Sequence, residues 1–176
     1  MRIRRKHLGI LLVTGLLTAP LGATSLAPTS AEDLTAKATL IVLGECTAVE
    51  TRWVGRALYT LATVTVEETW KGAVEATVTV ALPGGVDLNR PVPIDVRYPG
   101  APQLAPGNEA VLFLTEDPTV TGAYAVVGFN AGAVPLTAAP TGDAVVMQRS
   151  VGTERLSIQA LGQRVRQWVA EEGGAP

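Results

Sequence analysis

TLATVTVEETWKGAVEATVTVAL, residues 60–82, is the stretch that decides the fold of this chain. Small apolar residues alternate with polar ones over residues 60–70, and the same alternation returns over residues 76–82. A period of two is typical of a β-strand with one buried face. Lys71-Gly72 lies between the two runs and predicts a hairpin turn. Pro83-Gly84-Gly85 predicts where the second strand ends.

Four further stretches predict strands around this hairpin: 40–49, 109–115, 124–129 and 144–147. Residues 109–115 contain a continuous apolar run, which is typical of a central strand covered on both faces. Short strands separated by Gly- and Pro-rich turns predict a mainly β domain, either a small barrel or a sandwich. The connection from Val86 to Gly107 is predicted as a long loop, a kind that often carries function.

The hydrophobic period changes near the C-terminus. Apolar residues then recur at helical spacing, at Ile158, Leu161, Val165, Trp168 and Val169. With Ser157 as a candidate N-cap, we expect one amphipathic helix over 156–172, packed on the β-domain, and a frayed tail at 173–176. Gly162 costs this helix about 1 kcal/mol relative to alanine, so packing must hold it in place.

The first 31 residues predict a cleavable signal peptide. Basic residues at 2–6 precede an apolar run from Leu8 to Leu17, which is too short to span a bilayer. Two cleavage points fit the small-x-small rule. The first-ranked one follows Ala31, and the other follows Ala27 and would leave Pro28 at the new N-terminus. We therefore expect export to the periplasm, cell envelope or exterior, with a mature β-domain at 32–155.

The mature chain is predicted to be acidic. Ten basic and sixteen acidic residues follow residue 31, so its net charge is near −6. A negative chain repels phosphate backbones, and no basic stripe is present, so we expect no nucleic-acid partner. No stretch after residue 31 is apolar for long enough to span a membrane.

The residue inventory argues against an enzyme. The single histidine, His7, lies in the predicted signal peptide, and the serines after residue 31, Ser150 and Ser157, lie outside any Gly-x-Ser-x-Gly turn. Ser/His/Asp and Cys/His mechanisms are thereby excluded from the mature chain. A tetrahedral zinc site would lack ligands, so we expect no metal and no cofactor.

Cys46 is the single cysteine, so the chain has no internal disulfide. In a strand over residues 40–49 it shares a face with Leu40 and Val42, which predicts a small core residue. A disulfide between two chains stays open as the alternative.

Carboxylate pairs are the remaining route to catalysis. Glu67 and Glu68 would point to opposite faces of a strand, and Glu116-Asp117 falls in a predicted turn. A carboxylate-dependent or calcium-assisted exported enzyme is therefore kept as the alternative to a binding module. A structural envelope protein is a further alternative.

Several short runs keep a recognisable order along the chain. They are residues 38–45, 49–53, 59–60, 64–72, 78–80, 83–85, 100–102, 106–107, 111–114 and 127–128. Together they resemble a family of bacterial exported proteins with no agreed activity, over most of residues 38–135. The first strand and the Trp70-Lys71-Gly72 hairpin also resemble netrin-like domains, the OB-fold module of tissue inhibitors of metalloproteinases. This resemblance implies a five- to six-stranded OB-like barrel.

One departure limits what this resemblance implies. Metalloproteinase inhibitors of this type chelate the protease zinc with an N-terminal cysteine, whereas the predicted mature start here is Glu32-Asp33. Their mechanism therefore cannot be transferred to any residue of this chain. An exported protease is a candidate partner by analogy alone.

Exposed Trp, Tyr and Arg side chains are the types that anchor protein interfaces. Arg52-Trp53 is predicted in a loop after the first strand, and Arg97-Tyr98 in the long connection. We predict these four residues as the binding site of a non-catalytic module for another envelope or secreted protein. The alternative is that Trp53 folds back on the barrel and Tyr98 packs over its rim.

Overall fold

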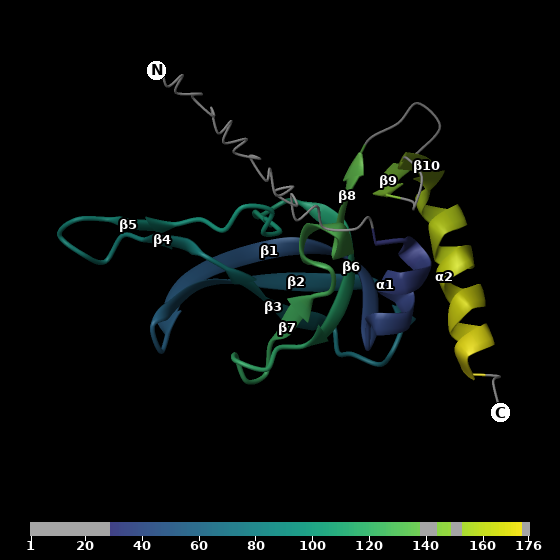
Figure 1. Cartoon of the computed structure of the whole chain (residues 1–176), viewed down its shortest axis with the longest axis horizontal. Coiled ribbons are helices and arrows are strands. Elements are labelled where there is room, and N and C mark those ends of the chain that lie inside the picture. Colours follow the sequence, from purple (N-terminus) through teal and green to yellow (C-terminus); the bar gives the residue numbers. More distant parts are fainter. Residues whose placement is uncertain (1–28, 138–143, 149–152, 174–176) are drawn as a thin grey trace, which may run out of the picture.

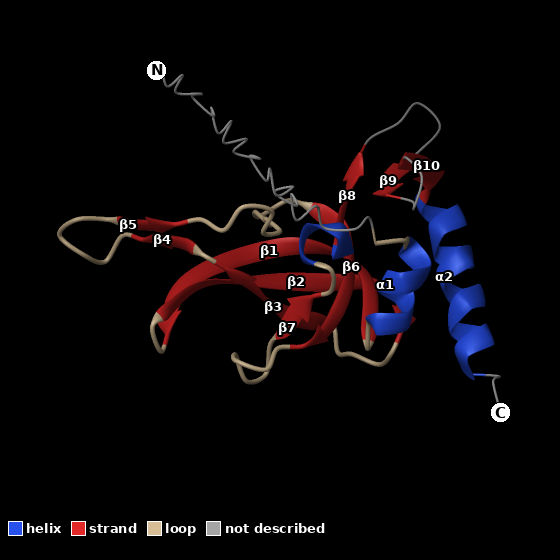
Figure 2. Cartoon of the chain, in the orientation of Figure 1, coloured by secondary structure: helices blue, strands red, loops and turns tan. Residues whose placement is uncertain are grey.

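The computed structural model describes residues 29–137, 144–148 and 153–173, which are mainly β (Figure 2). The predicted signal peptide up to residue 28, Ser150 and the tail from 174 lie outside these residues. The elements are α1 (Ala31–Lys37), β1 (Leu40–Val54), β2 (Ala57–Lys71), β3 (Thr77–Pro83), β4 (Gly85–Asp87), β5 (Ile94–Val96), β6 (Glu109–Glu116), β7 (Tyr124–Val126), the 3-10 helix η1 (Phe129–Gly132), β8 (Ala133–Thr137), β9 (Ala144–Gln148), β10 (Thr153–Ser157) and α2 (Ile158–Gly173).

Five strands close into a ring. β1 pairs with β2, β2 with β3, β7 with β6 and β6 with β1, all antiparallel, and β3 pairs with β7 in parallel. Because the ring is closed, each of these five strands has a partner on both sides over at least part of its length. The predicted mainly β architecture with one C-terminal helix is confirmed. β8, β9 and β10 extend the sheet outward from β6.

β1 is longer than predicted and pairs with two strands. It pairs with β2 from Ile41 to Val54, but with β6 only from Leu40 to Glu45. Register shifts between Ile41 and Val42, between Leu43 and Gly44 and between Cys46 and Ala48 interrupt the β1–β2 ladder, and such bulges bend a strand. β1 therefore leaves β6 and continues with β2 toward one end of the molecule (Figure 1).

The sheet has a hydrophobic core on each face. Inside the ring lie Val42, Cys46, Val64, Val80, Leu112 and Leu114. On the outer face, Ile41, Val111 and Phe113 pack with residues of α1 and α2. All residues from Ala110 to Leu114 are buried, because both faces of β6 are covered. This confirms the prediction of a central strand.

Cys46 is a core residue, as the strand pattern predicted. Its side chain is 1 % exposed inside the ring, in one cluster with Leu40 and Val42. Burial raises the pKa of the Cys46 thiol, which favours the neutral and less reactive form. A disulfide between two chains would require this thiol to leave the core.

α2 confirms the predicted amphipathic helix. Its apolar positions pack on the outer core, and the hydroxyl oxygen of Ser157 accepts a hydrogen bond from the Ala160 N–H at 3.2 Å. A Cβ atom on Gly162 would lie 3.1 Å from the indole ring of Trp70. Glycine at 162 therefore lowers the helix propensity but lets α2 approach the buried Trp70.

α1 was not predicted from the sequence. Ser30 and Asp33 form a capping box, in which the Ser30 Oγ accepts from the Asp33 N–H at 3.1 Å and the Asp33 carboxylate accepts from the Ser30 N–H at 3.2 Å. The Ser30 hydroxyl also donates to Asp33 Oδ2 at 2.7 Å, and this hydrogen bond, followed by the one from the Ser30 N–H, lowers the pKa of Asp33. Leu34 is buried in the outer core, and Lys71 Nζ donates to the Thr35 carbonyl oxygen at 2.7 Å. The predicted domain start at Glu32 thus falls inside a helix that belongs to the fold.

A chain that begins at Glu32 would lack the Ser30 cap. We expect residues 32–176 to be less stable to unfolding than residues 28–176 by about 1 kcal/mol, because the first turn loses its side-chain acceptor. Ser30→Ala in the longer chain should lose a similar amount. Urea unfolding of the three proteins measures this, and equal midpoints would show that the cap contributes nothing.

The prediction of one long loop from Val86 to Gly107 is wrong in part. β4 and β5 pair within it as a separate two-stranded sheet. This hairpin extends from the ring to one end of the molecule, opposite the end where α2 lies (Figure 1). Strands of three residues between prolines and glycines show no alternation, so the sequence did not reveal them.

Candidate binding surface

Trp53 lies within β1 and not in the predicted loop. It stands opposite Leu58 on β2, and its indole is 37 % exposed. The Trp53 Nε1 donates a hydrogen bond of 2.7 Å to Oδ2 of Asp87, the last residue of β4. The β4–β5 hairpin is therefore tied to the main sheet through the exposed indole.

Asp87 is the centre of this tie. The residue is only 8 % exposed, and besides Trp53 it accepts from the Asn89 N–H and from Arg90 Nε, each at 3.0 Å. The Arg90 guanidinium lies over the Trp53 ring, 5.2 Å from its centroid. The hydrogen bond from Trp53 is the largest cause that lowers the pKa of Asp87. The Asn89 amide and Arg90 add to it, while burial opposes it.

The Trp53–Asp87 hydrogen bond should persist until strongly acidic pH. A carboxyl whose pKa is lowered on folding stabilises the folded form above its ordinary pKa of about 4 and loses that contribution as the pH falls through the folded pKa. We expect the Trp53 indole N–H resonance to stay constant from neutral pH down to about pH 4 and to shift below it. The buried Trp70 indole is the internal control. A Trp53 midpoint well above pH 4 would contradict the role of Asp87.

Glycines allow the base of the hairpin to lie against β1 and β2. The Gly84 N–H donates to the Leu58 carbonyl at 2.8 Å, and Thr60 Oγ1 donates to the Gly84 carbonyl at 2.9 Å. Gly85 has a φ of +138°, and a Cβ atom there would overlap Thr60 Oγ1 and lie 2.8 Å from Thr51 Cγ2. Only glycine fits this approach.

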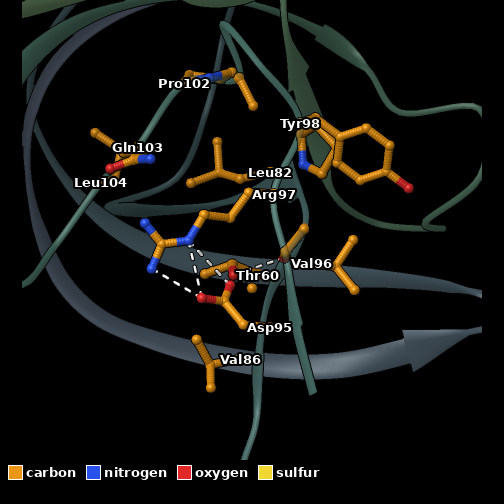
Figure 3. Close-up of a pocket in the computed structure, with 14 residues that line it drawn as sticks. Thr60, Leu82, Val86, Asp95, Val96, Arg97, Tyr98, Pro102, Gln103 and Leu104 are labelled. Carbon is orange, nitrogen blue, oxygen red and sulfur yellow. Dashed lines mark hydrogen bonds and ion pairs between the residues drawn. The ribbon is translucent and has the colours of Figure 1, made fainter.

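Arg97 and Tyr98 follow β5 and line a pocket of about 250 Å³ beside the base of the hairpin (Figure 3). Arg97 forms an ion pair with Asp95 at 2.9 Å, and this partner raises the pKa of Arg97. Tyr98 is 45 % exposed and lies on the opposite side of the pocket from the ion pair. Leu82, Val96 and Leu104 contribute apolar parts of the wall.

The structure separates Arg52 from the other three predicted residues. Successive side chains of a strand point to opposite faces, so Arg52 points away from the side of β1 that carries Trp53. Its register partner is Tyr59, which packs on the cluster around Val120 and not toward the hairpin. Trp53, Arg97 and Tyr98, by contrast, all lie along the β4–β5 hairpin.

Sequence reasoning missed the tip of the hairpin and its buried acid. Leu88 is 72 % exposed and Val92 is 75 % exposed, in the loop between β4 and β5. Asp87 and Arg90 were not selected either. The sequence did contain a signal for this tip. LNRPVP, residues 88–93, has two apolar residues among its prolines, whereas a solvent-exposed loop is usually polar.

Three pockets are lined by the described residues, and each of them contains a single acid. The pocket beside Arg97 has only Asp95, a second pocket of about 330 Å³ has only Glu109, and a third of about 230 Å³ has only Glu68. Asp117 Oδ1 accepts from the Thr119 and Val120 N–H groups at 2.7 Å, a local turn. Over residues 29–137, 144–148 and 153–173, no group of three His, Cys, Asp or Glu residues is placed to hold a metal ion.

Within the described part of the chain, no helix has the length and apolar character needed to cross a membrane. No protein-family model matches the chain, and no curated protein and no solved structure matches it either. The arrangement of the residues is therefore the basis for a functional proposal.

Proposed function

We propose that this protein is an exported, non-catalytic binding module that recognises another envelope or secreted protein through its β4–β5 hairpin. We name the hairpin surface as Trp53, Leu88, Arg90, Val92 and Tyr98. The observation that carries the proposal is the way in which Asp87 orients Trp53 and Arg90. A nearly buried carboxylate accepts three hydrogen bonds and thereby holds an exposed indole and guanidinium in position.

Single exposed apolar residues are ordinary on protein surfaces. The hairpin surface differs because Leu88, Arg90 and Val92 belong to one projecting element, which Asp87 connects to the exposed Trp53 of the main sheet. Trp, Tyr and Arg supply most anchors of protein interfaces. A pre-ordered surface also loses less conformational entropy on binding. These properties favour a recognition surface over a structural loop.

Two further parts of the proposal rest on the sequence. The basic start, apolar run and small-residue exit before residue 32 support export. An exported protease is one class of partner, suggested by the likeness to netrin-like inhibitors. The carboxylate enzyme is the weaker alternative, because each described pocket contains one acid.

Affinity capture tests the proposal. Residues 28–176 are immobilised and exposed to the envelope and secreted proteins of the native organism, beside Trp53→Ala and Tyr98→Ala variants. We expect one protein to be retained near equal stoichiometry, and Trp53→Ala to weaken its binding about tenfold, since aromatic anchors often contribute more than 1 kcal/mol. Circular dichroism should remain unchanged.

Phe129→Ala is the matched control, because Phe129 is an aromatic residue of similar exposure (41 %) outside the hairpin. Binding that both hairpin variants leave unchanged would place the binding surface elsewhere. A wild-type domain that retains no protein would end the protein-recognition proposal.

A further inference from the structure

One edge of β1 has no neighbouring strand beyond Glu45, where the pairing with β6 ends. The Cys46 N–H donates to the Asn108 carbonyl at 2.9 Å, and the Cys46 carbonyl accepts from the Gly107 N–H at 2.8 Å. Past Cys46, no strand of the described residues pairs with residues 48–54 on the side away from β2. We name residues 48–54 the free edge. Most of them are exposed, and such an edge is a template for pairing with another chain.

The backbone groups that the free edge offers can be assigned from the ladder with β2. The Leu58 carbonyl accepts from the Gly84 N–H at 2.8 Å, so the backbone groups of Leu58 are directed away from β1. Leu58 stands opposite Trp53, and both members of such an antiparallel pair turn their groups outward. By alternation, Val49, Thr51 and Trp53 direct their N–H and carbonyl groups to the free edge. The even-numbered positions direct theirs to β2.

The sequence of the free edge is complementary to itself. When two copies lie antiparallel about Thr51, Val49 of each copy faces Trp53 of the other, and Glu50 faces Arg52. Each of these pairs occurs twice, because the arrangement has two-fold symmetry. Opposite charges and an aromatic residue beside a β-branched one are favourable cross-strand pairs. The outward groups of the two edges also meet one another, so a hydrogen-bonded ladder can form.

Other registers lose either the hydrogen bonds or the charge pairs. A slip of one residue places outward groups opposite groups that are already used in the ladder with β2. A slip of two residues places Glu50 opposite Glu50, or Arg52 opposite Arg52, and like charges directly opposite are destabilising. Thr51 is also the middle residue of 48–54, so pairing about Thr51 overlaps the two free edges over their whole length.

We infer that this protein forms a symmetric dimer in which the free edges of two copies pair antiparallel about Thr51. Charged residues at an edge usually prevent pairing, but Glu50 and Arg52 admit an antiparallel copy of themselves. Neither residue forms an ion pair within residues 29–137, 144–148 and 153–173. Glu45 and Arg56 flank the two ends of the free edge, and antiparallel pairing brings these opposite signs together as well. A second copy supplies all of these partners at once, which favours it over a strand of another protein.

The dimer places both β4–β5 hairpins on the same face of the joint sheet. Its two-fold axis is perpendicular to the sheet, so Trp53 of both copies lies on one face, and Asp87 connects each Trp53 to its own hairpin. Two hairpins on one face would increase the avidity for a target with two sites. The dimer itself does not depend on the proposed function, because it forms without any target.

Sedimentation of the purified protein, expressed as the full chain, tests the dimer at rising concentration. We expect dimers to form as the concentration approaches about 1 mM, since one strand edge is smaller than a standard interface of about 1,600 Å². Glu50→Arg and Arg52→Glu each turn two attractive pairs into two repulsive ones, so each should weaken dimerisation at least about tenfold. Glu75→Arg makes the same charge change at an exposed residue outside β1 and should alter it less than about twofold.

A mixture of the two edge variants is the sharper test. Glu50→Arg gives one copy two positive charges on its free edge, and Arg52→Glu gives the other copy two negative ones, so all pairs between the two copies are attractive. We expect the mixture to dimerise at concentrations where each variant alone stays monomeric. The double variant Glu50→Arg/Arg52→Glu exchanges the signs and should dimerise like the wild type.

Amide hydrogen exchange measures the register of the dimer. At high concentration, exchange at Val49, Thr51 and Trp53 should become slower, while Glu50 and Arg52 should not change, because their amides already bond to β2. A wild-type protein that stays monomeric up to about 1 mM would overturn the inference. A dimer that both single variants retain, or that their mixture does not restore, would show that the two copies do not pair through this edge.

Discussion

Gly44→Ala is expected to destabilise the domain by about 3 kcal/mol, the upper part of the range for an overpacked core. Gly44 lies in β1 between β2 and β6, next to the register shift at Leu43. A Cβ atom there would overlap the backbone carbonyl oxygen of Thr65 and lie 2.9 Å from Val64 Cγ1. Backbone cannot move aside as a flexible side chain can, so the ring of strands must distort.

Gly173→Ala is the matched control for Gly44→Ala. A Cβ atom on Gly173, at the end of α2, meets nothing within 4 Å. We expect its effect to stay within about 0.5 kcal/mol, as for surface substitutions in general. Urea unfolding compares the two variants. Similar midpoints for both would mean that β1 and β2 separate more easily than the close contact implies.

Phe113→Ala should cost about 3–5 kcal/mol, a large part of the roughly 5–15 kcal/mol that stabilises a typical domain. Phe113 is 0 % exposed and lies on the outer face of β6, in the core that also contains Leu34 of α1 and Leu161 of α2. Its removal leaves a cavity where the sheet meets both helices. We therefore expect the helices to loosen as well as the whole domain to lose stability.

Phe129→Ala is the comparison for Phe113→Ala, since these are the two phenylalanines of the chain. Phe129 is 41 % exposed, so its removal should change the unfolding free energy by less than about 1 kcal/mol. Thermal unfolding and hydrogen exchange of α1 amides would measure both effects. Equal losses for the two variants would show that the outer core does not depend on Phe113.

These stability variants also sharpen the functional tests. The β4–β5 hairpin extends to the end of the molecule opposite α2, which covers the outer core (Figure 1). Substitutions at Leu88, Val92 or Tyr98 should therefore change binding without the loss of stability expected for Phe113→Ala. Trp53→Ala is different, because it also removes a hydrogen bond to Asp87. The effect of Trp53→Ala on binding therefore includes loosening of the hairpin.

Local patterns predicted most of the fold. Alternation over residues 60–82 identified β2 and β3, and the apolar run of 109–115 identified β6 as a strand covered on both faces. Ser157 and the helical spacing after it identified α2. Each of these signals depends on neighbours within a few residues, and such neighbours can be read along the chain.

The two wrong predictions, the end of β1 and the absence of α1, also have physical reasons. β1 extends past Trp53 because β2 pairs with it along its whole length, and no local residue ends it earlier. The added length reverses the interpretation of Arg52, which a loop would have placed beside Trp53. α1 was missed because its capping Ser30 lies within the run of small residues that also resembles a cleavage site.

The sequence by itself determined the fold class and the residue types of this protein: a mainly β chain, a buried cysteine, a single histidine at position 7, and exposed aromatic and arginine candidates. Only the tertiary structure decided which of them act together. Trp53 and Asp87 are separated by 34 positions, and the hydrogen bond between them forms because β4 folds back along β1. Such contacts depend on strand register and on close approach at glycines, which no local pattern contains.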